Sequence, residues 1–237
     1  MYKYLIFDAD HTLIDFYADE RAAFRRTFSH YGVAYTAEDV EKARVLSDRV
    51  WAEEGLNNVH LESVQSAFHS KYFSHLPRLI DRIKEITPMS APSEEIAAYF
   101  VKELYVPSFV IGNALETFKN FSKKYKTCIA TNGITDMQRA RLKEFLPYTY
   151  KLFVSEELGT IKPNAAFFTG MLARLEAQKE ECLFIGDSLS SDIAGCNAVG
   201  MDCIWVNPHG LPLPQGAKVK AVVSAVEEVE NFLFGEK

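Results

Sequence analysis

Residues 4–12 have the sequence YLIFDADHT, in which a short apolar run, Tyr4–Phe7, is followed at once by Asp8 and Asp10. An apolar run without alternation is typical of a strand that is covered on both faces, as in a parallel sheet. In an open parallel sheet, ligands bind beyond the carboxyl ends of the strands. The stretch therefore predicts a buried first strand that carries two carboxylates to a binding site.

The C-terminal half of the chain repeats this pattern of short apolar runs separated by amphipathic stretches. We predict further strands at Lys126–Thr131, Lys151–Val154, Cys182–Ile185, Cys203–Val206 and Ala221–Val223. Helices are predicted near residues 135–145, 164–177, 190–199 and 225–234, the last with the capping-box spacing of Ser224 and Glu227. Strands that alternate with helices predict an α/β fold, a Rossmann-like parallel sheet flanked by helices.

Between Asp15 and Pro107 the pattern changes, and no convincing strand is found. Apolar residues with helical spacing occur in two groups there, Phe24, Phe28 and Tyr31, and then Leu61, Val64, Phe68 and Tyr72. We therefore predict an all-α insertion over residues 15–107. The Rossmann-like core would then be formed by residues 1–14 and 108–237.

The bulk composition narrows the range of partners. The chain of 237 residues has a net charge of −6 and no cluster of basic residues, which argues against a nucleic-acid polymer as partner. The first apolar run is too short for a signal peptide, and no stretch is long enough to span a bilayer. The four cysteines lack CxxC spacing, so we interpret them as reduced thiols. We expect a cytoplasmic protein that binds neither membrane nor nucleic acid.

Polar side chains follow several of the predicted strands and should meet at one edge of the sheet. They are Asp8, Asp10 and Thr12 after the first strand, Thr131, Asn132 and Gly133 after the second, Lys162 before the helix that follows the third, and Asp187 and Asp192 after the fourth. Carboxylates such as Asp8 and Asp187 are the hard oxygen ligands that Mg²⁺ prefers. Lys162, the Thr131 hydroxyl and backbone N–H groups around Asn132 and Gly133 can bind phosphoryl oxygens. The set predicts a site that holds a divalent cation and a phosphate together.

In that site Asp8 would attack phosphorus, while Asp10, two residues later, would reach the leaving oxygen. Each signal is weak alone, because a D-x-D-x-T pattern occurs by chance in about one in twenty chains of this size. A lone Asp at a strand end is usually a turn former or a helix cap. The prediction rests on the order of these residues along the chain and on their shared position at strand ends.

These motifs resemble those of the haloacid dehalogenase-like hydrolases over almost the whole chain. The family's first motif, D-x-D-x-T, resembles Asp8 to Thr12, and its second, a Thr or Ser after a strand, resembles Thr131. Its third, a Lys usually followed by Pro, resembles Lys162-Pro163. Its fourth, G-D-x-x-x-x-D, resembles the stretch from Gly186 to Asp192. The helical insertion is similar to the cap that closes over the active site in this family.

The resemblance implies a role for each residue of the site. Asp8 would be the nucleophile that forms an aspartyl-phosphate, and Asp10 the acid that protonates the leaving group and then activates water. Mg²⁺ would be bound by Asp8, Asp187 and the backbone carbonyl of Asp10. Thr131 and Lys162 would hold the phosphoryl group, and Asp192 would support Lys162 or a metal-bound water. This mechanism needs Asp10 to ionise at a higher pH than Asp8, which a metal beside Asp8 would favour.

Two details resemble a subgroup, the pyrimidine 5′-nucleotidases. His11 stands where many family members have Gly, giving D-A-D-x-T-L, and residues 155–163 have the subgroup's pattern S-E-E-x-G-x-x-K-P. The resemblance implies nucleoside monophosphates as substrates, with His11, Phe16 and Tyr17 as candidates for contact with them. A His at position 11 would more often face solvent or cap a turn. For Trp51 we favour packing within the cap's own core over stacking on a base.

Several alternatives stay open. The N-acylneuraminate-9-phosphate phosphatases share part of the subgroup pattern, and a phosphomutase keeps the same motifs. A dehalogenase would not need Asp10, because no leaving oxygen has to be protonated. A receiver-type phospho-accepting module has its acidic residues in another order and has no large insertion, and a phosphate-binding descendant would be expected to have lost a motif position. Release of inorganic phosphate from a generic phosphate ester, with and without Mg²⁺, distinguishes a phosphatase from the phosphomutase, the dehalogenase, the receiver-type module and the phosphate-binding descendant.

Overall fold

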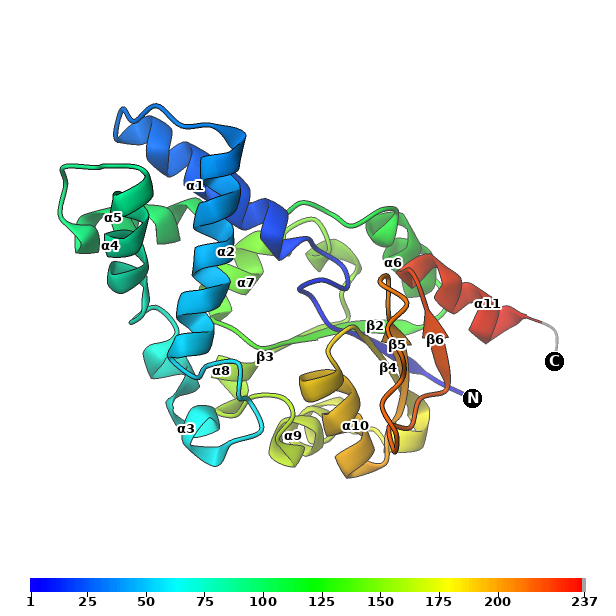
Figure 1. Cartoon of the computed structure of the whole chain (residues 1–237). Coiled ribbons are helices and arrows are strands. Elements are labelled where there is room, and N and C mark those ends of the chain that lie inside the picture. Colours follow the sequence, from blue (N-terminus) through cyan, green and yellow to red (C-terminus); the bar gives the residue numbers. More distant parts are fainter. Residues whose placement is uncertain (236–237) are drawn as a thin grey trace.

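The computed structural model describes residues 1–235 of the chain. Its centre is a parallel sheet of six strands in the order β3-β2-β1-β4-β5-β6 (Figure 1). The strands are β1 (Tyr4–Phe7), β2 (Lys126–Thr131), β3 (Lys151–Val154), β4 (Cys182–Gly186), β5 (Asp202–Val206) and β6 (Ala221–Val223). All the predicted strands are present, β4 and β5 each one residue longer than predicted, and the predicted α/β class is confirmed.

Helices cover both faces of the sheet, which explains why its strands are apolar without alternation. On one face Leu5 and Phe7 pack with helices α6 and α11, and on the other Tyr4 and Ile6 pack with α9 and α10 (Figure 1). The helices of the core are α6 (Ala114–Ser122), α7 (Thr135–Arg141), α8 (Ser155–Leu158), α9 (Ala165–Leu175), α10 (Ala194–Val199) and α11 (Val229–Phe234). Short helical turns lie at Leu146–Tyr148, Lys179–Glu181, Leu189–Ile193 and Val226–Glu228.

The insertion after β1 is helical, as predicted. It contains α1 (Phe16–His30), α2 (Ala37–Glu53), α3 (Glu62–Lys71), α4 (Leu76–Ile86) and α5 (Ser93–Glu103). Asp15 starts α1 by accepting a hydrogen bond from the Ala18 N–H (2.9 Å), and Thr36 and Asp39 form a capping box on α2. Helices α1, α2, α4 and α5 share an apolar cluster of their own, to which Met137 of α7 contributes. The insertion's limits, residues 15 and 107, stay a prediction.

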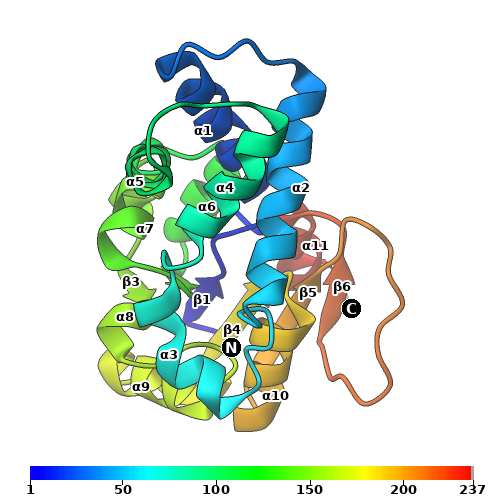
Figure 2. The same ribbon diagram turned by 60° about the vertical axis from the view of Figure 1, so that its left-hand side comes forward.

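Figure 2 shows how the insertion lies over the core, with α3 next to α8 and α9. Two hydrogen bonds join α3 to the core: His69 Nε2 to Ser155 Oγ (2.8 Å) and Asn164 Nδ2 to Gln65 Oε1 (2.7 Å). The insertion therefore covers the edge of the sheet at which the strand ends meet.

The prediction that Ser224 and Glu227 form a capping box on the last helix is wrong, because Ser224 pairs with Glu228. Ser224 donates its hydroxyl to Glu228 Oε1 (2.5 Å) and its N–H to Glu228 Oε2 (2.9 Å). Glu227 instead accepts a hydrogen bond from the N–H of Asn113, at the start of α6 (2.7 Å). A short helical turn before α11 shifts the register by one residue, and the spacing in the sequence does not reveal this turn. Within residues 1–235, no helix has the length and apolar character needed to cross a membrane.

Candidate active site

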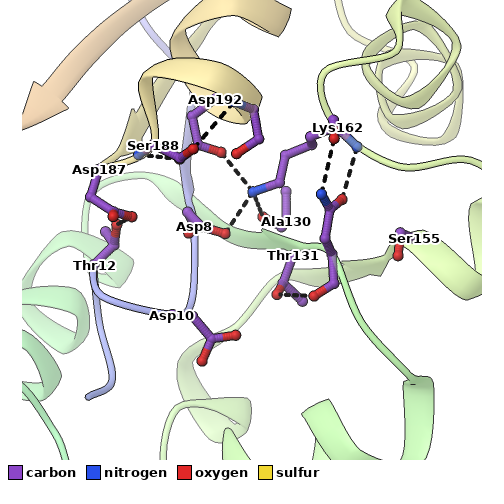
Figure 3. Close-up of polar contacts among 12 residues, drawn as sticks. Asp8, Asp10, Thr12, Ala130, Thr131, Ser155, Lys162, Asp187, Ser188 and Asp192 are labelled. Atoms are coloured by element: carbon purple, nitrogen blue, oxygen red, sulfur yellow. Dashed lines mark hydrogen bonds and ion pairs between the residues drawn. The ribbon is translucent and has the colours of Figure 1, made fainter. Parts of the chain in front are cut away.

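The strand order places the predicted site residues together. β1 lies between β2 and β4, so that Asp8, Thr131 and Asp187 come from the carboxyl ends of neighbouring strands. The Asp8 N–H continues the ladder by donating to the Ile185 carbonyl (2.8 Å). Figure 3 shows these side chains and Lys162 converging on one edge of the sheet.

Lys162 is the charged centre of this group. Its Nζ donates to Asp8 Oδ1 (2.6 Å), Asp192 Oδ1 (2.7 Å) and the Ala130 carbonyl (2.9 Å) (Figure 3), and the residue is 1% exposed. Burial alone would lower the pKa of Lys162, but the charges of Asp192 and Asp8 outweigh burial and raise it. The second oxygen of Asp192 accepts the Ser188 N–H (3.1 Å). The ammonium group therefore stays charged between two carboxylates that it holds in place.

Three carboxylates lie close enough to share a cation. One oxygen each from Asp8, Asp187 and Asp192 lies within 4.8 Å of the others, and Thr12 Oγ1 donates to Asp187 Oδ1 (3.1 Å). Burial and the neighbouring carboxylates raise the pKa of Asp8 well above its ordinary value and that of Asp187 to about 7. A divalent cation would relieve this crowding, and an all-oxygen donor set fits Mg²⁺. The Asp10 carboxylate is outside this cluster, consistent with the prediction that only its backbone carbonyl would bind the metal.

Gly186 explains part of the fourth motif. A Cβ atom at this position would lie 2.3 Å from Asp192 Oδ2, so any larger residue would displace the carboxylate that holds Lys162. Asp192 itself lies on the turn Leu189–Ile193, which starts with the Ser188 hydroxyl accepting the Ser191 N–H (3.2 Å).

Asp10 has partners that the sequence did not predict. Arg141 Nη2 lies 2.6 Å from Asp10 Oδ1 and 2.9 Å from Asp19 Oδ2, which belongs to α1 of the insertion. Gln138 Nε2 donates both to Asp10 Oδ2 (3.2 Å) and to Thr131 Oγ1 (2.7 Å). Arg141 and Gln138 are both almost fully buried. Because they lie three residues apart on α7, the two side chains share one face of the helix. The sequence shows this shared face, but polar pairs of this kind usually face solvent.

These partners affect the order of ionisation. Burial raises the pKa of Asp10, but the Arg141 guanidinium outweighs burial, and the net pKa lies below the ordinary value. The pKa of Asp8 is raised. Without a cation the order is therefore the reverse of the one that the predicted mechanism needs, because Arg141 stabilises the charged form of Asp10.

Two predicted phosphate-binding groups have other partners. The Asn132 side chain accepts the Lys162 N–H (2.8 Å) and donates to the Lys162 carbonyl (3.0 Å), so it fixes the backbone that carries the lysine. The Gly133 N–H donates to Ser155 Oγ (2.9 Å) and in this arrangement cannot bind a phosphoryl oxygen. Binding of phosphate by backbone N–H groups around Asn132 and Gly133 stays a prediction.

A cavity of about 300 Å³ lies inside the insertion and reaches its junction with the core. It is lined by His11, Phe16, Tyr17, Glu20, Ser47, Asp48, Trp51, Tyr72, Phe73, His75, Leu76, Phe100, Leu104 and Met137. His11, which directly follows Asp10 in the sequence, is one of the lining residues, and Phe16, another, lies 4.9 Å from the guanidinium of Arg141, the ion-pair partner of Asp10. All three predicted substrate-contact residues belong to it.

The side chains at the mouth of the cavity are arranged by ring contacts. The His11 and Tyr17 rings lie 4.4 Å apart between centroids, and the Arg141 guanidinium lies 4.9 Å from the centre of the Phe16 ring. Arg44 lies 4.5 Å from the centre of the Tyr17 ring. His11 has a φ of +61°, in the left-handed region, which explains why Gly suits this position. His11 therefore serves the turn and also lines the cavity.

The Trp51 ring forms T-shaped contacts with three rings, Phe68, Tyr72 and His75. This matches the preferred interpretation that Trp51 packs within the insertion, although one side of it lines the cavity.

Known proteins are similar to this chain in sequence and in fold. The chain belongs to the haloacid dehalogenase-like hydrolases, whose family model matches residues 2–200. It is 31% identical over 221 residues to the pyrimidine 5′-nucleotidase PynA of Streptococcus pneumoniae, covering 89% of this chain and 86% of the relative. It is 28% identical over 235 residues to the pyrimidine 5′-nucleotidase YjjG of Escherichia coli, covering 98% of each. The predictions of the family and of a phosphatase within it are confirmed.

The fold has close counterparts among solved structures. The HAD-hydrolase YfnB of Bacillus subtilis, in a crystal structure bound to magnesium, superposes with a TM-score of 0.79 at 24% identity, covering 98% of this chain and 99% of that one. The likeness extends over core and insertion, which supports the assignment of α1–α5 as the family's cap.

Proposed function

We propose that the chain hydrolyses pyrimidine nucleoside 5′-monophosphates in a Mg²⁺-dependent reaction through an aspartyl-phosphate on Asp8. The observation that carries the proposal is the continuity of two sites. Arg141 links the carboxylate–lysine centre and the aromatic-lined cavity: its Nη2 lies 2.6 Å from Asp10 Oδ1, and its guanidinium lies 4.9 Å from the centre of the Phe16 ring, which lines the cavity. A phosphate at Asp8 would thus place its leaving group at the mouth of the cavity.

The chemistry would proceed in two transfers. Asp10 must first take up a proton from solvent against the charge of Arg141. An Asp8 oxygen then attacks phosphorus, the bond to the ester oxygen breaks, and Asp10 gives that oxygen its proton. Asp10 then takes a proton from a water molecule while the water oxygen attacks the phosphorus of the aspartyl-phosphate. This attack regenerates Asp8 and releases inorganic phosphate. When bound among the carboxylates, Mg²⁺ would supply positive charge for the phosphoryl oxygens.

The other residues hold this arrangement in place. Lys162 and Thr131 would bind phosphoryl oxygens, Asp192 and the Asn132 side chain fix Lys162, and Thr12 fixes Asp187. Because phosphoryl transfer depends mainly on positioning and charge, these supporting contacts matter as much as the reacting groups.

The cavity supports a base as the leaving-group moiety. Its volume of about 300 Å³ is at the small end for ligand sites. Stacking on an aromatic side chain contributes about 1–3 kcal/mol of binding free energy per base and tolerates different bases. Two relatives, PynA and YjjG, are named pyrimidine 5′-nucleotidases, which supports the same class of substrate. A sugar-phosphate phosphatase, for example for N-acylneuraminate 9-phosphate, and a phosphomutase are the competing activities. Membership of a hydrolase family removes the non-enzymatic alternatives.

The test is a substrate comparison. Pyrimidine nucleoside 5′-monophosphates should have a higher kcat/KM than their 3′ isomers, hexose phosphates or N-acylneuraminate 9-phosphate. A sugar phosphate with the highest kcat/KM would refute the nucleotidase proposal while leaving the phosphatase assignment intact. Transfer of the phosphoryl group to a second sugar hydroxyl, in place of release, would favour a phosphomutase.

The aromatic contact is tested separately by Phe16→Ala. Loss of the ring should raise KM for nucleotides by about tenfold, the equivalent of 1.4 kcal/mol of stacking, and raise it less for p-nitrophenyl phosphate. An equal rise for both substrates would show that Phe16 serves only to support Arg141.

A further inference from the structure

The cavity contains a buried carboxyl group that the proposed reaction does not use. Glu20 of α1 is 3% exposed, and its Oε1 accepts a hydrogen bond from the Ser47 hydroxyl of α2 (2.7 Å). Its Oε2 is buried and has no hydrogen-bond partner among residues 1–235. Buried polar atoms nearly always have a partner, so a partner from outside the chain is the natural explanation for this one.

Glu20 is also placed where a bound base would need a polar contact. It lies four residues after Phe16 and three after Tyr17 on α1, so the three side chains project from one face of the helix. All three line the cavity. A base that stacks at its mouth would therefore extend its edge toward Glu20.

The surroundings of Glu20 favour its neutral form. Within the described residues it forms no ion pair, and the charges that act on it, Asp48, Arg44 and Arg141, lie beyond hydrogen-bond contact. Burial raises the pKa of Glu20 to about 8. A neutral carboxyl group has one O–H donor, and because Oε1 already accepts from Ser47, the proton belongs on Oε2.

We propose that Glu20 is a specificity-determining residue whose Oε2–H donates a hydrogen bond to an acceptor on the pyrimidine ring, a carbonyl oxygen or ring nitrogen, while Ser47 fixes the carboxyl group. The inference rests on the proposed function, in that the ligand is a nucleotide. A site built around a buried hydrogen-bonding group rejects ligands that leave this group unpaired. Ribose 5-phosphate, which lacks a base, is therefore the matched comparison substrate.

The experiment measures the ratio of kcat/KM for uridine 5′-monophosphate to that for ribose 5-phosphate. Glu20→Leu should lower this ratio by about tenfold or more, through KM for the nucleotide, because the donor is lost. Glu20→Gln should keep the ratio within about threefold, because its amide can still donate from the same place. Asp81→Asn is the matched control: Asp81 also accepts a hydrogen bond from a serine of the cap, Ser93, but lies outside the cavity, so the ratio should not change.

The outcomes separate the two proposals. A wild-type ratio near one would refute the proposed function and this inference together. A high wild-type ratio that survives in Glu20→Leu would refute the role of Glu20 alone. If Glu20→Gln loses as much as Glu20→Leu, an amide donor does not replace the carboxyl group, and the donor role is wrong.

Discussion

The edge of the sheet and the cap cavity are built on opposite plans. At the edge, each charged group has a partner: Lys162 lies between Asp8 and Asp192 and also reaches a backbone carbonyl. In the cavity, aromatic rings surround a carboxyl group, Glu20, with one oxygen left without a partner. A site for chemistry must be organised before the substrate arrives, whereas a site for recognition can leave a contact for the substrate to complete.

The largest effect should come from removing the nucleophile at the edge of the sheet. Asp8→Asn should reduce phosphate release to less than about a thousandth of the wild-type rate, because an amide cannot form the aspartyl-phosphate. The fold should persist, since Lys162 keeps Asp192 as partner. Phosphate release at saturating substrate and a thermal melt check both statements. A residual rate above that limit would remove Asp8 from the role of nucleophile.

Metal removal should have a similar effect on the same region. Chelation should abolish activity, and Mg²⁺, Mn²⁺ or Co²⁺ should restore it. Ca²⁺ should inhibit, because its longer bonds and higher coordination number loosen the in-line geometry. Mg²⁺ should also raise the melting temperature, since a cation that binds only the folded state stabilises it. Full activity in excess chelator would refute the metal site.

A smaller effect is expected where the two regions meet. Arg141→Met should lower the free energy of unfolding by about 3–5 kcal/mol, because it leaves the buried carboxylate of Asp19 and the partly buried carboxylate of Asp10 without their shared cation. Arg139→Met is the matched control, two residues away in an exposed pair with Glu157, and should cost about 0–1 kcal/mol. Urea unfolding of both variants measures the difference, and equal losses would show that Arg141 is no stronger a link than a surface pair.

The edge of the sheet could be predicted from the sequence because its geometry follows from chain order. Strand ends of a parallel sheet converge, so Asp8, Thr131 and Asp187 could be placed together from the positions of three apolar runs. Lys162 could be placed by the same rule, as the residue before a helix predicted after the third strand; in the structure α8 follows β3 first, and Lys162 precedes α9. Here local sequence and tertiary position specify the same site.

The residues that sequence analysis missed come from helices. Arg141, Gln138 and Glu20 are polar residues on α7 and α1, and helical spacing alone does not show whether a polar face meets solvent or another domain. Arg141 becomes buried because the cap carries Asp19 against it, a contact between residues 122 positions apart. The packing of the cap helices determines the shape of the cavity, and no sequence motif predicts that packing. The limits of the cap and its contacts with substrate could therefore be proposed from the sequence but not located.

The last effect is a change of stability with pH, and it concerns the unpaired carboxyl group of the cavity. The pKa of Glu20 rises from its ordinary value of 4.5 to about 8 on folding, with burial as the main cause. The folded state therefore holds a proton that the unfolded state loses near pH 4.5, and stability falls as pH rises between these two values. The slope is at most about 1.4 kcal/mol per pH unit.

Glu20→Gln has no proton to lose, so its stability relative to wild type should rise from pH 5 to pH 8 and then level off. Urea unfolding at intervals across this range tests it, with Asp81→Asn as the control for an exposed carboxylate. A constant difference between wild type and Glu20→Gln would mean that Glu20 is charged in the folded protein, and the cavity would then require a hydrogen-bond donor from its ligand.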